Sequence, residues 1–84
     1  MNAKHRKNLL LIFEKPTRAD IRYEDVKALL IAAGAIIREG KGSRVRFEKD
    51  ENSVHIHKPH PDRVLPKYSV ELVRDFLVMI GVEI

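Results

Sequence analysis

Cysteine is absent from the sequence, and long hydrophobic runs are scarce. Without cysteine the chain can form no disulfide, no thiol nucleophile and no thiolate metal site. The longest apolar run covers residues 9–13, far fewer than the roughly 20 residues that a membrane-spanning helix needs. Basic residues precede this run, but Glu14, Lys15 and Pro16 end it without a small-residue cleavage site. We therefore expect neither export nor membrane insertion, and a cytoplasmic location.

The 84 residues suffice for a single small domain, residues 1–84, and 44% of them are hydrophobic. A core of this size cannot also enclose a deep cofactor pocket, so we expect a function carried by the surface and no cofactor. Lys and Arg outnumber Asp and Glu by 16 to 12, which gives a net charge of +4. This excess suits a polyanionic partner such as a nucleic acid.

Apolar residues at helical spacing predict three helices. The first covers residues 2–14 and ends before Pro16, because proline disfavours helical geometry at the residue preceding it. The second covers residues 23–33, with Gly34 as its left-handed C-terminal cap. The third is predicted to begin at Ser69, whose hydroxyl can cap the first turn.

Between the second and third helices the hydrophobic period falls from about four residues to two, which is typical of strands. Strands are predicted over residues 35–39, 43–49 and 54–58, joined by turns at 40–42 and 50–52. Such short connections favour an antiparallel meander. The predicted fold class is α+β: a helix, a three-stranded antiparallel sheet and a helix, with an additional N-terminal helix. Helices before and after the sheet should pack on one face and leave the other open.

Alternation along the strands places basic residues on that open face. Val45 and Phe47 are predicted to point towards the helices, so their neighbours in sequence point outward. The outward set contains Arg38, Arg44, Arg46, Glu48, His55 and His57, with Lys41 in the turn at its edge. Guanidinium groups bind phosphates through paired hydrogen bonds, and histidine transfers protons near neutral pH. The pattern indicates a surface for holding and cleaving an RNA backbone; an ordinary solvated face is the alternative.

Two other kinds of chemistry are conceivable for these residues. His55, His57 and His60 have a spacing that could supply three ligands of a zinc site. The prolines on both sides of His60 favour instead a role in holding the loop, and no metal is expected. Ser43 has no His–Asp arrangement next to it in sequence, so serine-nucleophile chemistry is not expected.

Residues 23–81 resemble the HicA family of toxin–antitoxin systems. The resemblance is carried by residues 26–30 leading to Gly34, by Gly42-Ser43 at the second strand, by Pro59-His60-Pro61, and by residues 70–81. Members have a fold like the double-stranded-RNA-binding domain. The resemblance therefore implies a HicA-like core over residues 23–81, to which residues 1–16 add a helix.

The resemblance also implies a metal-independent endoribonuclease, an mRNA interferase, that is neutralised by a HicB-like antitoxin. The family usually has its catalytic histidine directly after the Gly-Ser pair, where this chain has Arg44. A guanidinium cannot act as a general base at neutral pH, but its fixed charge can stabilise a transition state. His57 or His55 would then deprotonate the 2′-hydroxyl. The expected RNA-binding residues are Arg38, Lys41, Ser43, Arg44 and Arg46.

Arg44 also raises an alternative hypothesis, in which the domain binds RNA or its antitoxin without cutting RNA. The apolar stretch Leu9 to Phe13 raises a separate expectation about partners. It could form an interaction surface for a homodimer or an antitoxin instead of joining the core.

Overall fold

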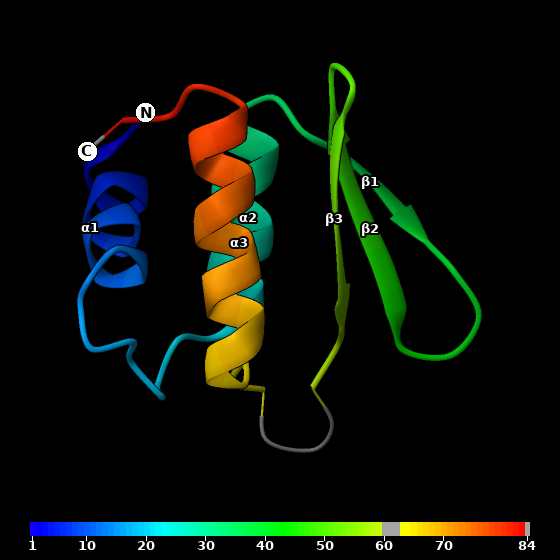
Figure 1. Ribbon diagram of the computed structural model, residues 1–84, viewed down its shortest axis with the longest axis horizontal. Coiled ribbons are helices and arrows are strands. Elements are labelled where there is room, and N and C mark those ends of the chain that lie inside the picture. Colours follow the sequence, from blue (N-terminus) through cyan, green and yellow to red (C-terminus); the bar gives the residue numbers. More distant parts are fainter. Residues whose placement is uncertain (60–62, 84) are drawn as a thin grey trace.

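The computed structural model describes residues 1–59 and 63–83 (Figure 1). Within them lie α1 (Ala3–Ile12), α2 (Tyr23–Ala32), β1 (Ile36–Glu39), β2 (Arg44–Lys49), β3 (Asn52–His57) and α3 (Lys67–Met79). The strands form an antiparallel sheet in the order β1-β2-β3. The predicted α+β class, the order of the elements and the meander are confirmed.

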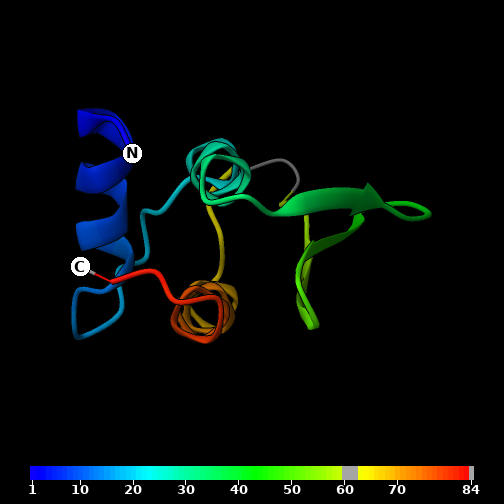
Figure 2. The same cartoon turned by 90° about the horizontal axis from the view of Figure 1, so that it is seen from above.

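Figure 2 shows that the elements form three layers, with the sheet at one end, α2 and α3 in the middle and α1 at the other end. The helices α2 and α3 lie on one face of the sheet, as expected. The additional helix α1 packs behind them, on the side away from the sheet. The other face of the sheet is therefore left open, and α1 lies far from it.

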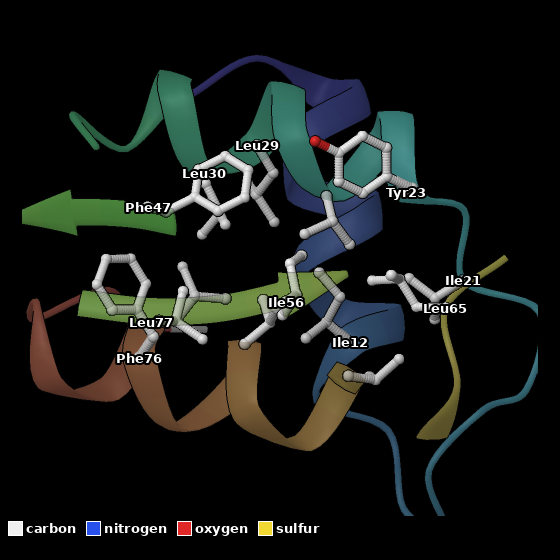
Figure 3. Close-up of a cluster of buried hydrophobic side chains, with 14 of the residues drawn as sticks. Ile12, Ile21, Tyr23, Leu29, Leu30, Phe47, Ile56, Leu65, Phe76 and Leu77 are labelled. Carbon is white, nitrogen blue, oxygen red and sulfur yellow. The ribbon is translucent and has the colours of Figure 1, made fainter. Parts of the chain in front are cut away.

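The core lies between the sheet and the two middle helices and continues between these helices and α1 (Figure 3). Phe47 of β2 is fully buried beside Leu29 and Leu30 of α2, and Phe76 of α3 is fully buried as well. Burying one such side chain stabilises a fold by about 1.5–3 kcal/mol. The alternation predicted for β2 and β3 is confirmed, since the buried residues of these two strands are Val45, Phe47, Val54 and Ile56.

Helix α1 is joined to the core by apolar contacts and by an arginine of α3. Leu9 and Ile12 are 4% and 1% exposed. Arg74 of α3 donates hydrogen bonds to the carbonyl oxygens of Ile12 (3.1 Å) and Glu14 (3.2 Å), which the end of a helix leaves without intrahelical partners. The expectation that Leu9–Phe13 is an interaction surface is thus wrong for Leu9 and Ile12, which are core residues.

The helix ends show one confirmed prediction and one wrong one. Gly34 adopts the left-handed conformation expected of it, with φ +99°, and the next residue donates a 3.0 Å hydrogen bond to the Leu30 carbonyl. Ser69, however, is not the cap of α3. The helix begins two residues earlier, at Lys67, with Pro66 before it, because the Pro66 carbonyl already accepts the first hydrogen bonds of the helix. Ser69 is buried inside the first turn.

Candidate nucleic-acid interface

The open face of the sheet carries two rows of polar side chains, because facing residues on neighbouring strands lie side by side. The strand register pairs Arg46 of β2 with Arg38 of β1 on one side and His55 of β3 on the other. We call these three residues the middle row. Arg44 of β2 is paired with His57 of β3, and we call these two the end row. The rows are two residues apart, about 6.7 Å along the strand.

Both rows line a hollow of about 510 Å³. All five of their side chains belong to exposed residues, and Glu39 and Gly40 complete the rim beside the end row. The hollow is wide and open to solvent, unlike the deep pockets that bury most of a small ligand. Its shape suits a segment of an extended polymer.

Glu48 reduces the positive charge of the middle row. It lies on the same face of β2, and its side chain is 19% exposed. Its carboxylate accepts a 2.8 Å hydrogen bond from Nε of Arg38 and forms an ion pair with Arg46. One acid thus holds both arginines and neutralises one of their two charges. The sequence predicted the position of Glu48 on this face but not its ion pairs.

Arg44 differs from the other two arginines, since no ion pair between described residues involves it. Its position is set by the backbone of the turn between β1 and β2. The N–H of Gly40 donates a 2.9 Å hydrogen bond to the Arg44 carbonyl, and Gly42 has φ +65°, a left-handed conformation that glycine adopts without strain. Arg44 therefore presents an uncompensated charge directly opposite His57.

Ser43, which directly precedes β2, contacts His57 at the end of β3. Its Oγ lies 3.1 Å from Nδ1 of the ring. The N–H of Lys58 donates a 2.8 Å hydrogen bond to the Ser43 carbonyl, so the pairing of the two chains continues one step beyond the end row. Ser43 was predicted to touch RNA, and its contact with a histidine 14 residues away was missed. The turn was predicted at residues 50–52, but Asn52 already belongs to β3 and the turn covers residues 50 and 51. A turn of two residues was the available signal, because a tight turn fixes which residues face each other.

The remaining basic residues of this region are less central. Lys41 is exposed in the turn but is outside the set of described residues that line the hollow. Lys58 forms a 2.8 Å ion pair with Glu39 at the rim. The hydrogen bond and the charge of Lys58 lower the pKa of the Glu39 carboxyl below its ordinary value, and the same contacts raise the pKa of Lys58.

Two further expectations concern metals and membranes. Across residues 1–59 and 63–83, no cluster of three or more His, Cys, Asp or Glu side chains is arranged to hold a metal ion. His60, the third ligand of the zinc alternative, lies outside these ranges. Within the same ranges, no helix has the length and apolar character needed to span a membrane.

Comparison with known protein families identifies a match for most of the chain. A family model described as the HicA toxin of bacterial toxin–antitoxin systems matches residues 23–74. The matched part begins with α2, contains the whole sheet and both rows, and ends within α3; α1 precedes it. No curated protein and no solved structure matches the chain significantly. Because the model covers more than half of the sequence, the chain belongs to the family of HicA toxins of bacterial toxin–antitoxin systems.

Proposed function

We propose that this toxin binds mRNA on the open face of its sheet and cleaves it without a metal ion. The observation that supports this most strongly is the end row, in which His57 faces Arg44 across two paired strands. A group that can accept a proton thus lies beside a permanent positive charge in an open, basic hollow. We propose the cytoplasm as its location and a HicB-like antitoxin as its partner.

In the proposed reaction the nucleophile comes from the RNA itself. His57 accepts the proton of a 2′-hydroxyl, and the oxygen attacks the adjacent phosphorus. The bond from phosphorus to the 5′-oxygen breaks, the departing oxygen takes up a proton, and a 2′,3′-cyclic phosphate remains. Arg44 stabilises the charge that develops on the non-bridging oxygens. Because attacking oxygen and phosphorus belong to one molecule, no metal-bound water is required.

The middle row is proposed to bind a neighbouring phosphate of the same strand. Glu48 holds the Arg38 and Arg46 guanidinium groups in place, so they lose little freedom when RNA binds. The step of about 6.7 Å between the rows allows one strand of RNA to contact both. Binding in the middle row would then place the next phosphate at the end row.

The proposed function is tested by incubating RNA with purified protein in excess EDTA. We expect fragments that end in a 2′,3′-cyclic phosphate, because the 2′-oxygen is the nucleophile. RNA whose 2′-hydroxyls are methylated is the matched control and should remain intact. Cleavage that stops in EDTA, or that proceeds equally on the methylated RNA, would contradict the proposal.

A second candidate is supported by Arg44 itself, which occupies the place of the usual catalytic histidine of the family. On this alternative the same face binds RNA, or the antitoxin, without cutting. Intact RNA that nevertheless stays bound in the EDTA experiment would favour it over the nuclease.

A further inference from the structure

Two histidines face the hollow, and the structure gives them different surroundings. His57 lies 3.1 Å from the Ser43 hydroxyl through Nδ1, within the usual range of a hydrogen bond. His55 lies between Arg46 and solvent on the edge strand, and no side-chain hydrogen bond between described residues involves it. A general base works best when a third group fixes its orientation. Of the two histidines, His57 has such a group.

The backbone around Ser43 holds this contact, although both residues are exposed. The Ser43 carbonyl accepts the hydrogen bond from Lys58, the residue that follows His57. On the other side, Gly42 turns the chain so that Ser43 enters the strand pairing at this point. Arg44 and His57 are then paired in register. Serine and imidazole are therefore adjacent by the geometry of the hairpin, and the short serine side chain has little entropy to lose.

The contact decides which nitrogen of His57 is free. A neutral imidazole has one N–H and one lone pair, and the partner of one nitrogen sets the state of the other. Ser43 occupies Nδ1. If its oxygen accepts a hydrogen bond from Nδ1–H, the lone pair is on Nε2 and can take a proton from RNA. If the hydroxyl donates instead, Nε2 carries the hydrogen and cannot act as a base.

We infer that Ser43 is a positioning residue for His57: its oxygen accepts the Nδ1–H bond and so keeps the lone pair on Nε2. This inference rests on the proposed function of the same site, and it selects His57 over His55 as the base. It also replaces the expected role of Ser43 as a phosphate contact. The role of His55, beside Arg46 in the middle row, is then to help bind phosphate.

The inference is tested by ¹⁵N NMR of the histidine rings in the full chain, at a pH where they are neutral. In the wild type we expect the His57 signals of the form with hydrogen on Nδ1. In Ser43→Ala the signals should move towards the other form, which free histidine prefers in water. Ser43→Thr keeps an acceptor oxygen and should restore the wild-type signals. His55 serves as the internal control, with unchanged signals in both variants.

Cleavage kinetics provide the second measurement. Losing the orientation of the base should lower kcat about tenfold in Ser43→Ala, a part of what a general base contributes. KM should change less than about twofold, because phosphate binding is left to the arginines. An unchanged His57 tautomer, or an unchanged kcat, would overturn the inference. A tautomer shift in a protein that cleaves no RNA would support the positioning role and contradict the proposed function alone.

Discussion

At the scale of single residues, Glu48 lowers the positive charge of the open face. It is the acid that pairs with both Arg38 and Arg46, and it competes with any phosphate for them. If RNA binds the open face, one of its three arginines, Arg44, is fully available and the other two are partly neutralised. Glu48 keeps these two ordered, at the expense of electrostatic attraction.

Replacing this acid should therefore strengthen RNA binding. For Glu48→Gln we expect the affinity for single-stranded RNA to rise several-fold at low salt, with a steeper loss on adding salt because more counterions are released. Fluorescence anisotropy titrations at several salt concentrations measure both quantities. Glu51→Gln, in the turn between β2 and β3, changes the charge by the same amount away from the arginines. Equal effects of the two substitutions would contradict the account.

The buried hydroxyl of Tyr23 is expected to lower the free energy of unfolding. The side chain is 4% exposed, and its hydroxyl is buried with no hydrogen-bond partner among the described residues. An unpaired buried hydroxyl is unfavourable by about 1–3 kcal/mol. Tyr23→Phe should therefore leave the free energy of unfolding unchanged or raise it by up to about 1 kcal/mol. Urea unfolding measures this, and a clear loss of stability would show that the hydroxyl is satisfied in solution.

The pH dependence of the same variant gives a second check. Burial raises the pKa of the Tyr23 phenol above its ordinary value of 10.0. The unfolded chain then loses this proton at a lower pH than the folded chain, so the contribution of Tyr23 to stability falls as pH rises above about 10. We expect the wild type to lose more stability than Tyr23→Phe between pH 9 and 11. Parallel pH profiles would contradict the burial of an unpaired phenol.

At the scale of elements, Arg74 links α3 to the end of α1. Besides the carbonyls of Ile12 and Glu14, it donates a hydrogen bond to the Thr17 hydroxyl, at 3.1 Å. Arg74→Met keeps an apolar stem but removes all three hydrogen bonds. We expect it to lower the free energy of unfolding by about 1–3 kcal/mol, since the partly buried acceptors at Ile12 and Thr17 lose their partner.

Urea unfolding measures the effect of this substitution, and Arg63→Met is a suitable control. Arg63 is exposed, and no side-chain hydrogen bond or ion pair between described residues involves it. The control substitution Arg63→Met should therefore change the free energy of unfolding by less than about 0.5 kcal/mol. An effect of Arg74→Met as small as that of the control would mean that α1 is held by its apolar residues alone.

The elements also show what the sequence could and could not predict. Period-two alternation placed Phe47 inward and Arg46 outward, because each side of a strand repeats every second residue. The helix start at Lys67 could not be predicted from Ser69, since Pro66 offers a competing first turn and the choice depends on packing. The contact between Ser43 and His57 required the strand register, which alternation alone leaves open by whole two-residue steps. The ion pairs of Glu48 could not be predicted, because they depend on the side-chain conformations of two arginines.

At the scale of the whole molecule, the layers separate the open face from α1. The helix carries exposed Lys4 and Lys7, and it lies at the opposite end of the fold from the sheet (Figure 2). If RNA binds the open face, the layer formed by α2 and α3 lies between it and these lysines. A layer of helices is about 10–12 Å thick, which exceeds the Debye length of about 8–10 Å. If net charge alone determined RNA affinity, these lysines would contribute as much to it as the arginines of the sheet.

Charge removal at the two ends of the molecule distinguishes these views. Lys4→Gln with Lys7→Gln should change RNA affinity by less than about twofold at physiological salt, because their charges are screened at this distance. Arg44→Gln removes one charge, yet it should weaken binding by about tenfold, as expected for a lost hydrogen-bonded charge. Both affinities are measured by anisotropy titration. If the lysine variant lost more RNA affinity than Arg44→Gln, the net charge of the molecule and not the open face would determine binding.

We propose that His57, and not His55, is the base of a metal-independent ribonuclease. The most direct test is the single-turnover rate of RNA cleavage in EDTA for His57→Ala and His55→Ala, each at saturating protein. We predict that His57→Ala slows cleavage by about 100-fold or more, the contribution of a general base. His55→Ala should mainly weaken binding and leave the saturated rate within about threefold. Full activity of His57→Ala, or an equal loss in both variants, would contradict the account.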